Sequence, residues 1–167
     1  MKDKIKVNIS DEQKVIKVPT GTRMLIRRCC IAVLQLENFE GSAEVEVTLI
    51  DNAGIKAINA DKRNIDEVTD VLSFPLGQDG EYDINPANDA KMLGDIVLSV
   101  EKAQQQAEEF GNTFQREVAY LTVHSMLHLL GYDHVNGGLE AVKMREHEDM
   151  VLAAIGMPRS NAYPDLQ

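Results

Sequence analysis

The sequence predicts an α+β fold, a single domain in which a four-stranded mixed sheet is surrounded by about five helices. Two observations support this. Short runs with alternating apolar side chains indicate strands, and longer stretches with apolar side chains every three or four residues indicate helices. A chain of 167 residues, 44% of them hydrophobic, can bury the core of one domain. We therefore expect residues 1–167 to form one domain.

The predicted elements alternate along the chain. Strands are expected at about 5–9, 44–50, 69–74 and 94–99. Helices are expected at about 22–38, 52–62, 100–110, 113–130 and 139–155. Candidate N-terminal caps precede or begin four of these helices: Thr20 or Thr22, Asp51 or Asn52, Ser99, and Asn112 or Thr113. Residues 77–91 are polar and rich in turn formers, which is typical of a mobile loop.

Composition limits the possible functions. The net charge of −10 excludes binding of nucleic acid through bulk positive charge, although eight of the 17 Lys and Arg residues lie in residues 1–28. The sequence shows neither a signal peptide nor an apolar run long enough to span a membrane. Adjacent Cys29 and Cys30 fit reduced thiols better than a disulfide framework. We expect a cytoplasmic protein without membrane association.

The most informative stretch, residues 124–134, contains three of the four histidines. His124 and His128 are four residues apart, so on a helix they project from one face. Gly131 can end that helix in a left-handed turn, which lets the chain bring His134 back toward the pair. Three imidazoles and an open fourth position are the usual ligand set of catalytic zinc. The spacing therefore predicts a zincin-like metal-site helix that holds one Zn²⁺ per chain, with another divalent metal as the alternative.

The same stretch departs from the pattern of metalloproteases at one position. Their H-E-x-x-H-x-x-G-x-x-H motif places the glutamate that acts as general base directly after the first histidine. Here that position is Ser125, which argues against peptide hydrolysis.

Other polar residues are less informative by themselves. By itself, Arg63 fits a solvated charge in a loop, and Asp70 fits a strand-edge position or a cap. Asp133 can orient a ligand imidazole through its ring N–H, or can simply face solvent. His147 lies among charged residues in a predicted helix, and we interpret it as a surface histidine.

Three blocks of sequence together resemble one known family. Residues 124–134 resemble the H-G-x-L-H-L-x-G-Y-D-H signature of the YbeY family, with Ser125 where many members have glycine. Residues 58–75 are similar to a second signature of that family, L-N-x-x-x-R-x-x-D-x-x-T-D-V-L-S-F-P, with Ile58 in place of leucine. Residues 94–99 resemble a third block in the expected order.

The resemblance implies a metal-dependent endoribonuclease that cuts single-stranded RNA. It implies zinc ligation by His124, His128 and His134, and a critical basic role for Arg63 near the metal. It further implies maturation of the 3′ end of small-subunit ribosomal RNA and ribosome quality control. The implied partners are the small ribosomal subunit and assembly factors, including a GTPase.

The sequence leaves parts of the mechanism open. Either an activated water or the substrate's own 2′-OH can be the nucleophile, and Asp70, Asp95 and Asp133 are candidate bases by residue type alone. Two other functions remain as alternatives: a non-catalytic ribosome-assembly factor with a structural metal, and a metallohydrolase of another substrate. An open fourth ligand position argues against the structural metal.

Overall fold

The computed structural model describes residues 4–133 and 138–158, and these form five strands and five helices. The strands are β1 (Ile5–Asp11), β2 (Ala43–Ile50), β3 (Val71–Pro75), β4 (Ile84–Asn85) and β5 (Ala90–Ser99). The helices are α1 (Thr22–Leu36), α2 (Asn52–Arg63), α3 (Val100–Phe110), α4 (Phe114–Leu129) and α5 (Gly138–Ala154). The predicted α+β class is confirmed. None of the helices so described is long and apolar enough to cross a membrane.

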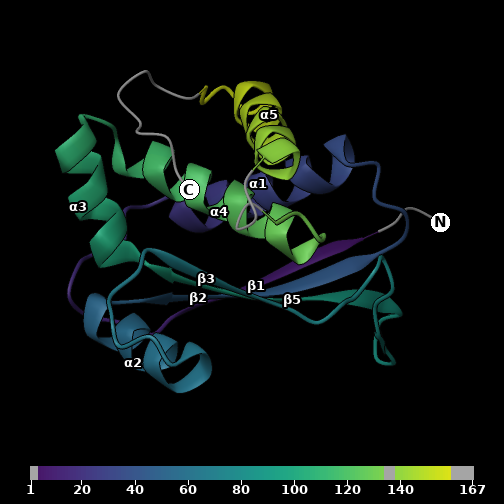
Figure 1. Cartoon of the computed structure of the whole chain (residues 1–167), viewed down its shortest axis with the longest axis horizontal. Coiled ribbons are helices and arrows are strands. Elements are labelled where there is room, and N and C mark those ends of the chain that lie inside the picture. Colours follow the sequence, from purple (N-terminus) through teal and green to yellow (C-terminus); the bar gives the residue numbers. More distant parts are fainter. Residues whose placement is uncertain (1–3, 134–137, 159–167) are drawn as a thin grey trace.

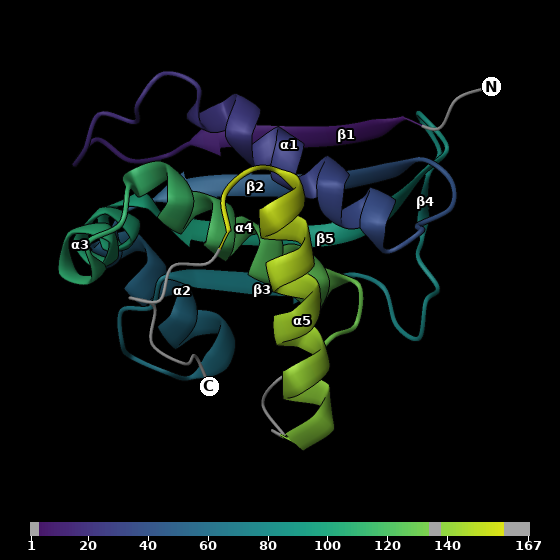
Figure 2. The ribbon, with the colours of Figure 1, turned by 90° about the horizontal axis from the view of Figure 1, so that it is seen from above.

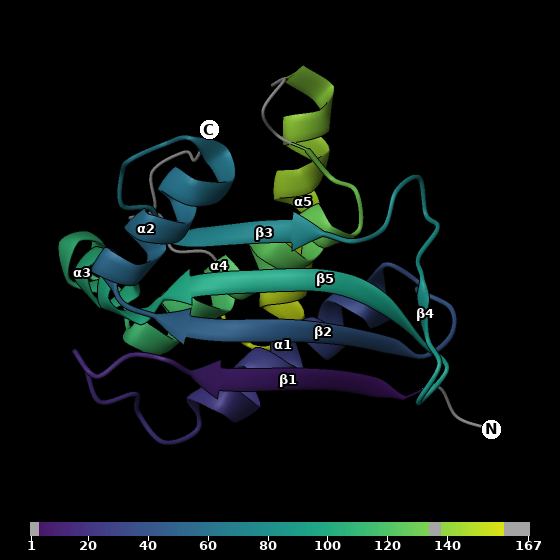
Figure 3. The same ribbon diagram turned by 90° about the horizontal axis from the view of Figure 1, so that it is seen from below.

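The strands form a mixed sheet in the order β1-β2-β5-β3, with the short β4 paired to β5. The β1–β2 and β2–β5 pairs are parallel, whereas β3 runs antiparallel to β5. Strands β1 and β3 therefore lie at opposite edges of the sheet, as Figure 3 shows. Because β3 is an edge strand, polar side chains from other elements can lie beside it.

Helix α4 lies over the middle of the sheet, together with α1 and α5, whereas α2 covers the opposite face (Figure 1). Seen from above, α5 crosses α4 on the side away from the sheet (Figure 2). Most residues of α4 are buried, because it packs against α1, α3, α5 and strands β3 and β5. A helix enclosed in this way has little freedom to move, which suits a helix that carries functional side chains.

The predicted caps are partly confirmed. The side chains of Asp51, Ser99 and Thr113 accept hydrogen bonds from the backbone at the starts of α2, α3 and α4. The predicted threonine cap of α1 is wrong. Gly21 occupies the cap position in a left-handed conformation, and the Thr22 hydroxyl donates instead to the Pro19 carbonyl at 2.8 Å.

The segment 77–91 is more regular than predicted. It contains β4 and the first residues of β5, so the sheet has a fifth short strand. The asparagines that suggested a loop anchor it, because the side chains of Asn85 and Asn88 donate to the Glu44 carboxylate at 2.8 and 3.3 Å. These amides and an Asn8 amide lower the pKa of Glu44, which keeps it charged as their acceptor.

Gly94 allows β5, β3 and α4 to pack closely. Its φ of +142° disfavours other residues, and a Cβ atom there would lie 2.3 Å from the Phe74 carbonyl oxygen and 3.0 Å from a Leu129 methyl. The β-bulge in β5, which shifts its register with β2 between Glu44 and Val45, lies immediately before this residue. Gly94 thus sets how near the edge strand lies to α4.

We expect Gly94→Ala to lower the free energy of unfolding by about 3 kcal/mol or more, because strain and a backbone clash add. Gly21→Ala is the matched control, since Gly21 also has a positive φ but no atoms within 4 Å of an added Cβ. The control should cost about 1–2 kcal/mol through strain alone. Urea unfolding of both variants measures the difference, and equal losses would contradict the close-approach argument.

Candidate metal centre

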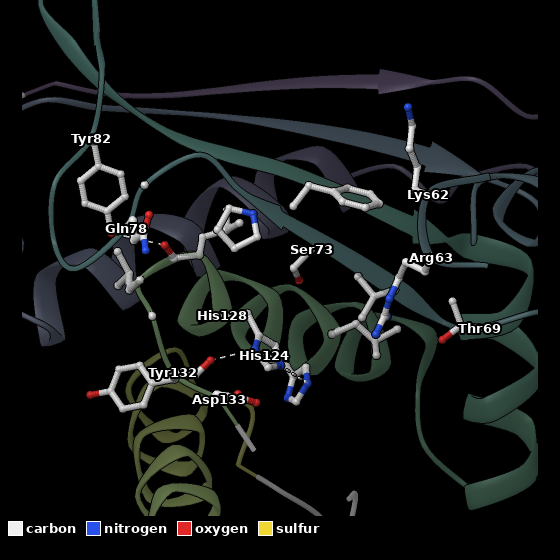
Figure 4. Close-up of a pocket in the computed structure, with 18 of the residues that line it drawn as sticks. Lys62, Arg63, Thr69, Ser73, Gln78, Tyr82, His124, His128, Tyr132 and Asp133 are labelled. Atoms are coloured by element: carbon white, nitrogen blue, oxygen red, sulfur yellow. Dashed lines mark hydrogen bonds between the residues drawn. The ribbon is translucent and has the colours of Figure 1, made fainter. Parts of the chain in front are cut away.

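A polar cavity of about 1100 Å³ opens between β3, the end of α2 and the C-terminal half of α4. Figure 4 shows many of the side chains that line it. The polar and charged lining residues are Lys62, Arg63, Thr69, Asp70, Ser73, Gln78, Asp79, Tyr82, Tyr120, His124, His128, Tyr132 and Asp133. The cavity therefore brings together the second and third thirds of the chain. Most of its residues come from two of the three sequence blocks, 58–75 and 124–134, and the others lie just after the first block or just before the second.

The two described histidines of the motif face each other. His124 and His128 both lie on α4, and their Nε2 atoms are 3.1 Å apart. The helix ends at Leu129, and Gly131 has the positive φ, +106°, that the sequence predicts for the turn after it. The chain can thus reverse direction immediately beside the two imidazoles.

An oxygen atom lies beside the other ring nitrogen of each histidine. The Nδ1 of His128 is 2.8 Å from the Tyr132 carbonyl oxygen, which can only accept, so this nitrogen carries the hydrogen. The Nδ1 of His124 contacts the Glu148 carboxylate, which is 5% exposed. In neutral rings these bonds assign the lone pairs to the two Nε2 atoms that face each other.

This arrangement fits a divalent metal. Two lone pairs 3.1 Å apart repel unless a proton or a cation lies between them. Zinc ligands at about 2.0–2.1 Å from the metal lie about 3.3 Å apart in a tetrahedral site. Hydrogen bonds from Nδ1 to a carboxylate and a carbonyl are the usual support of zinc-binding histidines.

The third predicted ligand, His134, lies outside the described residues. Among the residues that are described, no group of three or more His, Cys, Asp or Glu side chains is placed to hold a metal ion. Ligation by all three histidines therefore stays a prediction.

Arg63 lies at the last position of α2, on the opposite wall of the cavity from the histidines. In Figure 4 its side chain extends toward α4, whereas the neighbouring Lys62 extends away from it. Asn64 follows in a left-handed conformation and ends the helix, so Arg63 lies where the chain leaves α2 at the rim of the cavity. Within 4–133 and 138–158, no hydrogen bond or ion pair engages the Arg63 guanidinium, whereas Lys62 pairs with Asp61 at 3.5 Å.

The three candidate carboxylates differ in position. Asp133 is exposed on the cavity wall. Asp70 also lines the cavity, but its two oxygens accept from the Val71 N–H at 2.7 Å and the Gln106 amide at 3.3 Å. Asp95 does not line it.

The sheet register explains the position of Asp95. It lies opposite Phe74 in the antiparallel pair, two residues along from Leu72 and Val97, whose side chains pack with α2. Asp95 therefore belongs to the face of the sheet away from α4. Partial burial there raises the pKa of its carboxyl above the usual value.

Sequence reasoning missed Glu148. It lies on α5 four residues after Met144 and three before Val151, both buried, so it belongs to the buried face of the helix. A carboxylate on an apolar face needs a partner, and that was the available signal. The interpretation of the adjacent His147 as a surface residue is wrong, because its side chain is only 32% exposed and Nδ1 lies 2.5 Å from a Glu37 oxygen.

Ser125 supports the sequence argument against a peptidase. Its side chain is fully buried in α4 and does not line the cavity, so Ser125 is not placed to act as a base there. The position that supplies the base in metalloproteases is therefore structural here.

The fold and the site together define a class: an α+β protein with a polar cleft that faces an arginine toward paired, oriented imidazoles. Comparison with known proteins identifies the family. The family model described as "Endoribonuclease YbeY" matches residues 8–156. The chain belongs to the YbeY endoribonuclease family, as its three sequence blocks predicted.

Relatives named "Endoribonuclease YbeY" support this over most of the chain. The protein from Agathobacter rectalis is 48% identical over 140 residues, covering 77% of this chain and 84% of its own length. The one from Caldanaerobacter subterraneus is 45% identical and covers 92% of this chain and all of its own. The one from Clostridium botulinum is 42% identical, covering 92% and 99%.

A solved structure has a similar fold. The solution structure of TM1509 from Thermotoga maritima aligns with a TM-score of 0.57 and 25% sequence identity, over 91% of each chain. The predicted arrangement of one mixed sheet and its helices is thus found in an independently determined structure.

Glu148→Ala should weaken zinc binding by about 10- to 100-fold, because His124 loses the carboxylate that fixes its ring. Glu146→Ala on the same helix is the matched control, since Glu146 is an exposed carboxylate. Competition with a chromophoric chelator measures the affinities. Equal zinc affinity in both variants would remove Glu148 from the site.

Proposed function

We propose that this protein is a zinc-dependent endoribonuclease that cleaves single-stranded RNA, with His124, His128 and His134 as the zinc ligands. As a member of the YbeY family it is an endoribonuclease, a hydrolase that acts on RNA phosphodiester bonds, and the family is metal-dependent. One observation carries the assignment of the site. The two Nε2 atoms face each other at 3.1 Å in a polar cavity while both Nδ1 atoms contact oxygen atoms.

Different residues of the chain have different roles in catalysis. A divalent metal, when bound, supplies a Lewis acid for a phosphoryl oxygen and activates water for attack. Arg63 supplies a planar fork of N–H donors that binds two phosphoryl oxygens and stabilises the negative charge that develops on them. Glu148 and the Tyr132 carbonyl hold the ligand rings in place.

Among the candidate carboxylates, Asp133 is best placed to accept a proton during the reaction. It is exposed on the cavity wall and follows Tyr132 in the turn after α4. Asp70 already accepts three hydrogen bonds, which orient it for structure, and Asp95 faces the other side of the sheet.

The charge of the chain favours a partner-directed enzyme. With a net charge of −10, the protein gains little affinity for RNA from its overall field. Among the described residues that line the cavity, Arg63 and Lys62 are the only arginine and lysine, and Lys62 pairs with Asp61, which leaves Arg63 as the phosphate contact in this proposal. We propose that the small ribosomal subunit and its assembly factors bring ribosomal RNA to the cleft, in 3′-end maturation and ribosome quality control. In this proposal the whole chain, 1–167, is one cytoplasmic YbeY-like domain.

The decisive experiment compares cleavage of a labelled single-stranded RNA by wild type, His128→Ala, Arg63→Ala and Lys62→Ala proteins. Zinc content is measured on the same samples. Arg63→Ala should keep its zinc and lose about 10²- to 10³-fold in cleavage rate, since it removes one donor to the developing charge. His128→Ala should lose both zinc and activity.

Lys62→Ala is the matched control, because Lys62 neighbours Arg63 but extends away from α4 (Figure 4). It should retain most of the wild-type rate. Full activity of zinc-loaded Arg63→Ala would end the proposed role of Arg63, and equal activity in all four proteins would reveal a contaminating nuclease. Zinc-loaded wild type that cuts neither free RNA nor ribosomal particles would favour the non-catalytic assembly factor.

A further inference from the structure

Three polar side chains from distant parts of the chain meet behind the metal centre. Glu37 follows α1 directly, Tyr132 lies in the turn after α4, and His147 lies on α5. The Tyr132 hydroxyl donates to one Glu37 oxygen at 2.6 Å, and His147 Nδ1 lies 2.5 Å from the other. The hydroxyl is also 3.1 Å from His147 Nδ1, so the three groups form a closed cluster, here called the Tyr132 clamp.

Glu37, the member of the clamp that contacts both others, is largely shielded from solvent. The Glu37 side chain is 12% exposed, and the ring centroids of Tyr132 and His147 are 5.1 Å apart. Glu37 uses one oxygen for each neighbour, so it contacts both groups at once.

The backbone of Tyr132 connects the clamp to the metal centre. Its carbonyl oxygen accepts the hydrogen bond from His128 Nδ1, and its N–H donates to the Leu127 carbonyl at 3.0 Å. The residue before it is Gly131, which has a φ of +106°. As a glycine it has no side chain that could hold the turn in place. The position of this carbonyl therefore depends on that backbone hydrogen bond and on what anchors the Tyr132 side chain.

We propose that Glu37 and His147 are positioning residues of the metal centre: they anchor Tyr132 and thereby fix the carbonyl that orients His128. The inference deepens the proposed function and rests on its zinc site. Helix α5 then supports both described ligands with consecutive residues, His147 through Tyr132 and Glu148 by direct contact with His124. By linkage, metal binding and the docking of α5 stabilise each other.

Two measurements test the clamp on Tyr132→Phe, His147→Ala and Glu37→Ala proteins. The first is zinc affinity by chelator competition, and the second is hydrogen exchange of the Tyr132 amide in metal-free protein. Glu40→Ala and Glu146→Ala are the matched controls, since both glutamates are exposed and lie on the same segments as Glu37 and His147. We expect zinc affinity to fall about tenfold in the clamp variants, the lower end of what outer-shell partners contribute, and the Tyr132 amide to exchange faster.

A conservative variant separates positioning from general loss of structure. Gln at 147 can still donate to Glu37, so His147→Gln should recover most of the zinc affinity that His147→Ala loses. Urea unfolding of every variant identifies global destabilisation, which would raise exchange in the core amides of α4 as well as at Tyr132. The clamp predicts a change confined to the turn.

The outcomes distinguish this inference from the function on which it rests. If His128→Ala loses zinc while the clamp variants match their controls, the positioning role is wrong and the zinc site stands. If exchange rises at Tyr132 but zinc affinity does not change, the clamp orders the turn without positioning a ligand, and the inference is wrong. If His128→Ala binds zinc like wild type, the proposed zinc site itself fails.

Discussion

The hydrogen bonds at the Nδ1 atoms of His124 and His128 are the constraint on which the site depends. A histidine four residues from another on a helix still rotates about two side-chain bonds, and only a fixed ring offers its lone pair in one direction. The acceptors come from two separate places, α5 and the turn after α4. Any contact that fixes α5 or the turn after α4 therefore also fixes the positions of the two Nε2 atoms.

Helix α4 can supply this pair because it is enclosed. It packs between the sheet and α5, with α1 and α3 at its sides, and most of its side chains are buried (Figure 1). Gly94 brings the edge strand β3 close to its C-terminal end, which forms one wall of the cavity. Arg63 reaches the same cavity from the other wall because α2 ends there, at Asn64 in a left-handed conformation.

The acidic charge and the cleft have complementary consequences. The cavity needs only a few cationic groups to hold one phosphodiester, whereas long-range attraction of RNA would need many. A chain with a net charge of −10 therefore suits an enzyme whose substrate is presented by a partner. Such an enzyme can cleave the RNA that its partner presents while it binds other RNA only weakly.

Much of the fold was readable because local patterns reflect local forces. Alternating apolar residues marked β1 and β2, runs of β-forming or apolar residues marked β3 and β5, and side-chain caps at Asp51, Ser99 and Thr113 marked three helix starts. The threonine cap of α1 was wrong because Gly21 made a left-handed start possible, and Thr22 used its hydroxyl on the preceding loop. The β4 strand was missed because two residues carry no period, and its anchor, Glu44, lies about 40 residues away.

For the site, the sequence by itself determined the histidine pair on one helix face, the turn at Gly131 and the family, because these depend on spacing within a few residues. Only the tertiary structure decided which groups orient the two imidazoles. Glu37, His147 and Glu148 lie between 15 and 110 residues from the groups that they contact, and no local pattern reports such distances. It also showed that Asp95 does not line the cavity that Asp70 and Asp133 line, because the register of β3 on β5 places Asp95 on the face of the sheet that packs against α2. The sequence specifies which side chains are present, but packing in the folded protein determines where each of them points.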